Sequence, residues 1–249
     1  MIGTLLSFGR TNILISLAGG VFPALLWLWY WLREDSLHPE PREHIIRTFI
    51  AGMFGAIAAL LVELAFVDLG VRSSTEAALF GAIGIAAIEE LAKYLFAYVV
   101  ALRTIDYDEP VDAMIYLITT ALGFSAFENI LFILGTLSKK GLVAALILGD
   151  SRFLGATLLH VLASGTLGGV IGLFYYERPA AKRRGLIGGV ILAIALHSAY
   201  DFFIMPTSSG AASTSVLPVL LSVWGLIFLL LVFFEKVKKV RPSRTSLAN

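Results

Sequence analysis

An apolar stretch of the sequence, residues 81–102, holds three ionisable side chains near its middle: Glu89, Glu90 and Lys93. Lys93 follows the two glutamates by four and three residues, so one face of a helix can pair a carboxylate with the ammonium. Two carboxyl groups held together in a low dielectric do not both ionise easily, which leaves a carboxylic acid beside a carboxylate. Such a pair can take a proton from water and later give one to a leaving amine, so it predicts acid–base chemistry.

Other apolar stretches carry further polar residues. The segment "FSAFEN" places Glu128 beside Asn129, a later stretch contains His160, and "HSAYD" sets His197 and Asp201 four residues apart on one helix face. An acid or base at mid-membrane costs about 2.5–3.5 kcal/mol, so these groups should face one another, water or protein. Histidine and asparagine N–H groups there could stabilise the oxyanion of a tetrahedral intermediate.

The depth of these residues in their helices supports one shared site. With a rise of 1.5 Å per residue, four of them fall about 18–25 Å from the cytoplasmic ends of their spans. These four are Glu89, Glu128, His160 and His197. Glu63 lies at a similar depth with no motif around it, and we expect a structural or supporting role for it. For Glu90 and Lys93 the alternative is a buried ion pair that only holds helices in register.

The composition predicts the elements that must position these groups. The chain has 249 residues, of which 58% are hydrophobic and 15% charged, and its mean hydropathy is +0.86. A soluble domain would carry about a quarter charged residues. Apolar runs long enough to cross the hydrocarbon core recur along the chain, which predicts an all-α polytopic membrane protein. We expect about seven spans, at roughly 12–32, 46–68, 76–102, 111–135, 152–176, 185–205 and 216–235, and an interfacial position for residues 142–149.

Lysine and arginine set the expected orientation. They concentrate after the first, third and fifth expected spans and in the basic tail 236–249, so the N-terminus should lie outside and the C-terminus in the cytoplasm. We expect a single transmembrane domain over residues 1–249, in contact with lipid in a prokaryotic plasma membrane and without nucleic acid as a partner.

Because there is no cysteine, thiolate nucleophiles and cysteine-based metal sites are excluded. The HExxH, GxSxG and paired GxGD signatures are also absent.

Four motifs in order resemble the PrsW family of glutamic-type intramembrane proteases, which is distantly similar to the CAAX prenyl endopeptidases. They are "EELAK", "FSAFEN", a histidine in the next span, and "HSAYD"; the segments "HPEPRE" and "DYDEPVDAMIY" also resemble family members. The resemblance implies cleavage of membrane proteins, in some members of single-span anti-sigma factors. It implies a catalytic set of Glu89, Glu90, Glu128, His160 and His197, supported by Lys93, Asn129 and Asp201.

These residues leave three mechanisms open. We expect a metal-free endopeptidase without a cofactor, in which Glu89 activates water and shares the proton with Glu128. In a metal-dependent variant, His160, His197 and a glutamate or aspartate, for which we name Asp201, would bind Zn²⁺ with one position open. The same buried acids could also form the proton path of a small transporter, although we find no internal repeat of the kind such transporters show.

Overall fold

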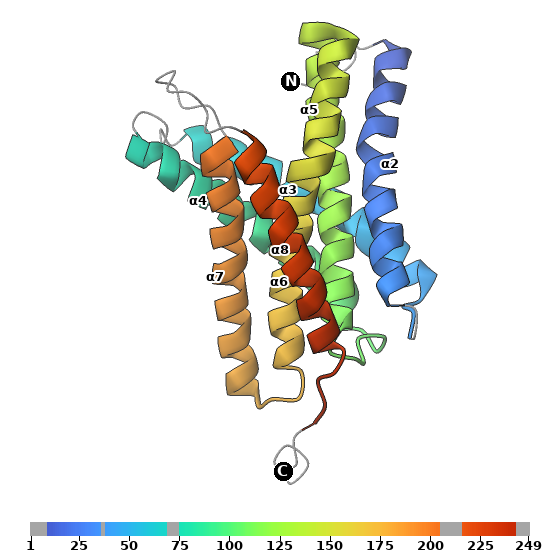
Figure 1. The fold of residues 1–249 in the computed structure, drawn as a ribbon, viewed down its shortest axis with the longest axis vertical. Helices are drawn as coiled ribbons and strands as arrows, with labels where there is room; N and C mark the ends of the chain where they lie inside the picture. Colours follow the sequence, from blue (N-terminus) through green and yellow to red (C-terminus); the bar gives the residue numbers. More distant parts are fainter. Residues whose placement is uncertain (1–8, 36–37, 69–74, 205–215, 243–249) are drawn as a thin grey trace.

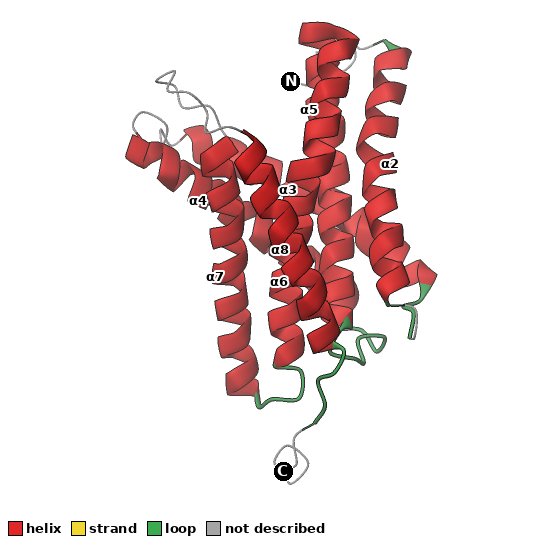
Figure 2. Cartoon of the chain, in the orientation of Figure 1, coloured by secondary structure: helices red, strands yellow, loops and turns green. Residues whose placement is uncertain are grey.

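Every element of regular structure is a helix in the part of the chain that the computed structural model describes. The described residues are 9–35, 38–68, 75–204 and 216–242, and none of them lies in a strand (Figures 1 and 2). The predicted all-α fold is therefore confirmed.

One helix forms over each of the seven predicted stretches. In chain order these are α2 (Arg10–Glu34), α3 (Arg42–Asp68), α4 (Thr75–Ala97) with the π-helical turn η1 (Tyr98–Leu102), α5 (Asp112–Ser151), the π-helical turn η2 (Arg152–Ala156), α6 (Thr157–Leu173), α7 (Pro179–Ile204) and α8 (Val216–Val237). Among the described residues, five helical stretches are long and apolar enough to cross a membrane: 10–34, 42–66, 112–173, 179–203 and 217–237. The third joins α5 to α6, and α4 with its buried charges is not among the five, so the exact number of spans stays a prediction.

Helix α5 extends well beyond its predicted end at residue 135. It continues to Ser151 with a break at Gly141, whose φ of 80° and ψ of −177° favour a residue without a Cβ atom. The chain turns back there, and residues 142–149, which were expected at the interface, form helix on the far side of the turn. The turn η2 then leads directly into α6, which runs back alongside α5 (Figure 1).

The first half of α5 is the centre of the bundle. All residues from 112 to 126 are buried, as expected for a helix surrounded by others. Glycines permit the closest approach: a Cβ atom on Gly123 would lie 1.9 Å from the carbonyl oxygen of Phe49, and one on Gly52 would lie 2.0 Å from that of Thr120. Helices α3 and α5 thus touch through their backbones, as small residues allow in membrane bundles. This contact fixes α5 and the glutamate that it carries five residues further on.

A contact between the ends of α2 and α8 closes the bundle. The ammonium of Lys238, just beyond α8, donates to the carbonyl oxygen of Glu34 (2.7 Å) and to Glu235 Oε1 (2.8 Å). This end lies opposite the end at which α2 begins (Figure 1). Lys238 belongs to the basic tail predicted at 236–249, of which residues 243–249 lie outside the described part of the chain.

The glycine contact predicts a position-specific loss of stability. Gly123→Ala should lower the free energy of unfolding by roughly 1–3 kcal/mol, because the new methyl group meets backbone that cannot move aside. Gly135→Ala is the matched control on the same helix, since nothing lies within 4 Å of a Cβ atom there. Thermal unfolding in detergent measures both variants, and equal melting temperatures would contradict the proposed backbone contact.

Candidate active site

A buried lysine lies at the centre of the cluster. The ammonium of Lys93 donates to Glu90 Oε1 (2.7 Å) and Glu89 Oε2 (3.3 Å), and it lies 2.8 Å from His160 Nδ1. Its side chain is fully buried, and the ring of Phe124 lies 4.4 Å from Nζ. An ammonium has three N–H donors and no acceptor. Lys93 therefore uses each donor on a different group and joins α4 to α6.

This arrangement determines the tautomer of His160. Because the Lys93 ammonium can only donate, Nδ1 of His160 accepts, and in the neutral ring the proton then sits on Nε2. That nitrogen lies 2.8 Å from Glu128 Oε2, which accepts the hydrogen bond. Arg152 Nη2 approaches the same oxygen at 3.3 Å. Glu128 is thus held by an imidazole N–H on one side and a guanidinium on the other.

The second glutamate of the pair is fully engaged. Glu90 accepts from Lys93, from Ser164 Oγ (3.0 Å), and from Nδ1 of His197, which lies 2.8 Å away. Three donors on a buried carboxylate stabilise its charged form and leave little capacity to take up a proton. With its Nδ1–H donated to Glu90, His197 directs Nε2 towards Glu89.

Glu89 is the least engaged of the three glutamates in the cluster. Its contacts are all long: 3.3 Å to Lys93 Nζ, 3.6 Å to His197 Nε2 and 3.9 Å to His160 Nδ1. Asp201 Oδ2 approaches the same nitrogen of His197, at 3.5 Å from Nε2. The Glu89 carboxyl therefore faces both imidazoles and keeps oxygen lone pairs available for water.

Arg152 is a site residue that the sequence analysis missed. Its Nε donates to Asn129 Oδ1, while the Asn129 amide donates to Thr157 Oγ1 (3.1 Å) and Ser125 Oγ (3.4 Å). Asn129 thus orients the arginine and does not enter the central cluster. Arg152 stands at the predicted boundary of a span, where arginine is common, so only the turn of the chain at Gly141 brings it to Glu128.

The structure therefore brings together all five predicted catalytic residues, from α4, α5, α6 and α7. The supporting residues Lys93 and Asp201 contact them directly, and Asn129 does so through Arg152. The side chains of Glu90 and Lys93 are inaccessible, whereas 21% of the Glu128 side chain, 15% of Asp201 and 14% of Arg152 is exposed. The site is thus open on the side of Glu128.

The donor set also fits a metal ion. Glu89, His160 and His197 each offer one ligand atom, and these three atoms lie within 4.8 Å of one another. Two imidazoles and one carboxylate are a catalytic zinc set that leaves a position open. The predicted ligand set named Asp201 in place of Glu89, and Asp201 is outside this group. Both ring nitrogens of His160 have other partners here, so a metal would compete with Lys93 or Glu128 for that ligand.

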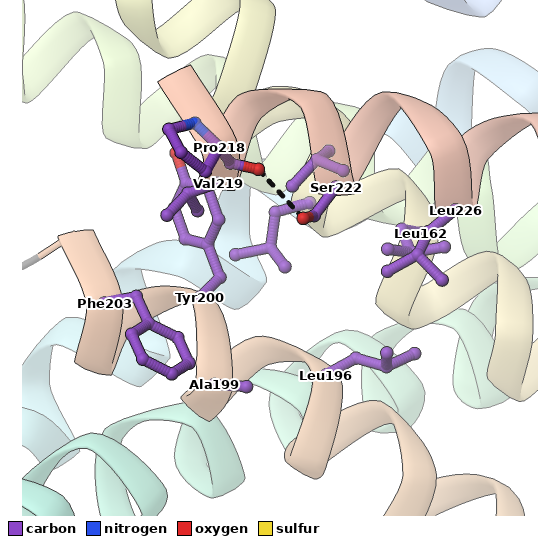
Figure 3. Close-up of a pocket in the computed structure, with 11 residues that line it drawn as sticks. Leu162, Leu196, Ala199, Tyr200, Phe203, Pro218, Val219, Ser222 and Leu226 are labelled. Atoms are coloured by element: carbon purple, nitrogen blue, oxygen red, sulfur yellow. Dashed lines mark hydrogen bonds between the residues drawn. The ribbon is translucent and has the colours of Figure 1, made fainter. Parts of the chain in front are cut away.

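Two pockets lie next to the cluster. One, of about 280 Å³, lies between α3 and α5 and is lined by Glu63 and Glu128 together with apolar residues. The other, of about 380 Å³, lies between α6, α7 and α8 (Figure 3). Its walls include Leu159 and Leu196, the neighbours in sequence of the two histidines, and it is almost wholly apolar.

The family comparison matches the same helices that carry the cluster. A model described as "PrsW family intramembrane metalloprotease" matches residues 40–233, which include all the residues of the site. The chain belongs to the PrsW family. The motifs predicted an intramembrane protease, and this is the activity that describes the family to which the chain belongs.

Curated PrsW proteins from several bacteria are similar to the chain over most of its length. "Protease PrsW" of Geobacillus kaustophilus is 24% identical over 92% of this chain and 92% of its own. The protein of the same name from Clostridioides difficile is 28% identical over 74% and 77%, and that from Shouchella clausii is 28% identical over 82% and 89%. No solved structure matches the chain.

The central position of Lys93 predicts that its replacement strongly lowers the stability of this PrsW family member. Lys93→Met should lower the free energy of unfolding by roughly 3–5 kcal/mol, because it leaves buried carboxylates without their cation. Adding Glu90→Gln should recover part of the loss, since it removes one of those charges. Thermal unfolding in detergent measures this, with Lys140→Met as the control on an exposed lysine. A Lys93→Met protein as stable as the control would refute the structural role of the ammonium.

Proposed function

We propose that this protein is an intramembrane endopeptidase of the glutamic type, in which Glu89 activates the attacking water. The observation that carries the proposal is the unequal engagement of the three glutamates. Glu90 is held by three donors and Glu128 by two, whereas the contacts of Glu89 are all 3.3 Å or longer. A general base needs free lone pairs directed at water, and Glu89 has them.

The proposed reaction is hydrolysis through a tetrahedral intermediate. Glu89 takes a proton from water as the water oxygen attacks the carbonyl carbon of the scissile peptide bond. The negative charge that develops on the carbonyl oxygen is stabilised by an N–H donor of His197, which donates Nδ1–H to Glu90 and, with a second proton on Nε2, presents an N–H beside Glu89. His160 donates its Nε2–H to Glu128 and orients that carboxylate. The proton then passes from Glu89 to the amide nitrogen, the C–N bond breaks, and the two products carry a new carboxyl and a new amino group.

A metal-dependent protease is the second candidate, favoured by the grouping of Glu89, His160 and His197. These residues would hold a Zn²⁺ ion, which supplies Lewis-acid polarisation of the carbonyl and a more acidic bound water. In that case Glu128 and Glu90 remain to orient the imidazoles of His160 and His197, as carboxylates commonly do for metal-ligating histidines.

The surroundings of the site favour membrane proteins as substrates. The outward faces of the helices carry exposed large apolar side chains, among them Phe22, Leu61, Leu221 and Phe228, which suit contact with lipid. We propose that the protein lies in the plasma membrane of a bacterium, since the curated relatives to which it is similar come from bacteria. A single-span protein such as an anti-sigma factor is the expected substrate, and nucleic acid is not an expected partner.

The glutamic mechanism predicts which substitutions abolish cleavage. In liposomes that contain a panel of single-span membrane proteins, Glu89→Gln should lower kcat/KM at least 10³-fold, and Glu128→Gln by about 10²-fold or more. Glu43→Gln is the control, since Glu43 lies on the surface of α3. Full cleavage by the Glu89→Gln protein would remove this mechanism.

Metal analysis separates the two candidates. The glutamic mechanism predicts that purified active protein contains much less than one equivalent of zinc and keeps its activity with a strong chelator. The metal-dependent mechanism instead predicts one equivalent, which His160→Ala and His197→Ala would each release. A zinc content that falls in parallel with activity would decide for the second candidate.

A further inference from the structure

The pocket between α3 and α5 leads to the exposed side of the cluster. Its volume is about 280 Å³, and Glu128 belongs both to its lining and to the hydrogen-bonded cluster. Of the side chains in the central cluster, that of Glu128 is the most accessible at 21%, compared with 7% for Glu89 and 3% for each histidine. A substrate approaching the cluster from this pocket would therefore meet Glu128 first.

A second acid lines this pocket. Ala56, Leu60 and Glu63 lie at positions i, i+4 and i+7 of α3, which places them on one face of the helix. Within the described part of the chain, no hydrogen bond or ion pair reaches the Glu63 carboxyl. An acid at this depth is costly without a partner. Glu63 is therefore a polar group directed at the place where a ligand would lie, in a wall that is otherwise apolar.

A membrane-spanning substrate supplies the groups that Glu63 lacks. The peptide bonds of a helix are enclosed by their own hydrogen bonds, so a scissile bond becomes accessible only after local unwinding. Unwinding leaves backbone N–H groups without partners, and in hydrocarbon each costs several kcal/mol. A carboxyl in an apolar pocket can accept these N–H groups and lower that cost.

We propose that the α3–α5 pocket receives the unwound segment of a membrane-spanning substrate and that Glu63 binds the backbone N–H groups of that segment. The proposal rests on the proposed protease function and assigns the entry side and a substrate-binding residue to it. Two residues of the α5 wall of the pocket contact Arg152: its guanidinium lies over the ring of Phe132, 4.0 Å from the ring centre, and reaches Glu128. The segment would thus run between Glu63 and the Glu128–Arg152 pair towards Glu89.

The larger pocket between α6, α7 and α8 lacks these features. Of the two hydroxyl-bearing residues that line it, Tyr200 and Ser222, the second donates to the carbonyl oxygen of Pro218 within the same helix (2.8 Å), as Figure 3 shows. No carboxyl group lines it, and its lining residues Leu159 and Leu196 are the sequence neighbours of His160 and His197. It therefore offers an unwound backbone few polar partners, and it is the matched alternative for the test.

Disulfide cross-linking tests the entry side. Because the chain has no cysteine, Leu131→Cys in the α3–α5 pocket and Ser222→Cys in the other pocket each introduce a unique thiol. Each is combined with Glu89→Gln and reconstituted in liposomes with synthetic single-span peptides that carry one cysteine at successive positions. We expect the yield of disulfide-linked peptide after oxidation to be at least tenfold higher at position 131 than at position 222. We also expect linkage at position 131 only when the peptide cysteine lies within one short segment of the peptide. Preferential linkage at position 222, or equal linkage at both, would overturn the proposal.

Kinetics test the role of Glu63 separately. Glu63→Leu should raise KM for a cleaved single-span peptide roughly tenfold, with kcat changed less than threefold, whereas Glu63→Gln should restore most of the affinity. An unchanged KM, or a loss confined to kcat, would overturn the binding role. Cross-linking at position 131 without cleavage of any peptide by the wild-type protein would instead reject the protease function while leaving the docking pocket in place.

Discussion

The structure depends on one buried ammonium. Removing a charge from water costs several kcal/mol even after relaxation, so Lys93 is tolerated at its depth only because each of its N–H groups has an acceptor. Two of these acceptors, Glu89 and Glu90, are on its own helix and the third, His160, is on α6. The ammonium binds Glu90 more closely than Glu89, so the two glutamates differ in how free they are, and it also fixes the orientation of the His160 imidazole. His160 in turn donates a hydrogen bond to Glu128, and Glu128 contacts Arg152, so the positions of these residues also depend on Lys93.

This chain of contacts explains why the bundle is built around α5. The first half of α5 is buried on all sides, and glycine contacts with α3 hold it at a fixed height. Glu128 therefore meets His160 at a position set by backbone packing and not by flexible side chains. The turn at Gly141 then returns the chain so that Arg152 reaches the same glutamate. Rigid helices thus determine which carboxyl is bound by donors and which is left available.

Much of the site could be predicted from the sequence because charge in a membrane is costly. Glu89, Glu128, His160 and His197 stand out in apolar stretches, and a spacing of four residues places Glu89 with Lys93, and His197 with Asp201, on one helix face. The contact of Arg152 with Glu128 and the position of Glu63 in the pocket could not be predicted in this way. Arginine at the end of a span is ordinary, and Glu63 has no neighbour in sequence that suggests a partner. Their positions depend on the turn after α5 and on the packing of α3, which are tertiary features.

The charge balance of the cluster connects the two candidate mechanisms. Four carboxyl groups, those of Glu89, Glu90, Glu128 and Asp201, face two permanent cations, Lys93 and Arg152. In a low dielectric the excess negative charge has to be neutralised, either by protons on a carboxyl or imidazole or by a bound cation. In the first case the cluster itself stores the proton that the leaving amine requires, and in the second it provides a site for a metal between Glu89 and the two histidines. Both mechanisms therefore follow from the same deficit of positive charge, and what distinguishes them is the identity of the cation that fills it.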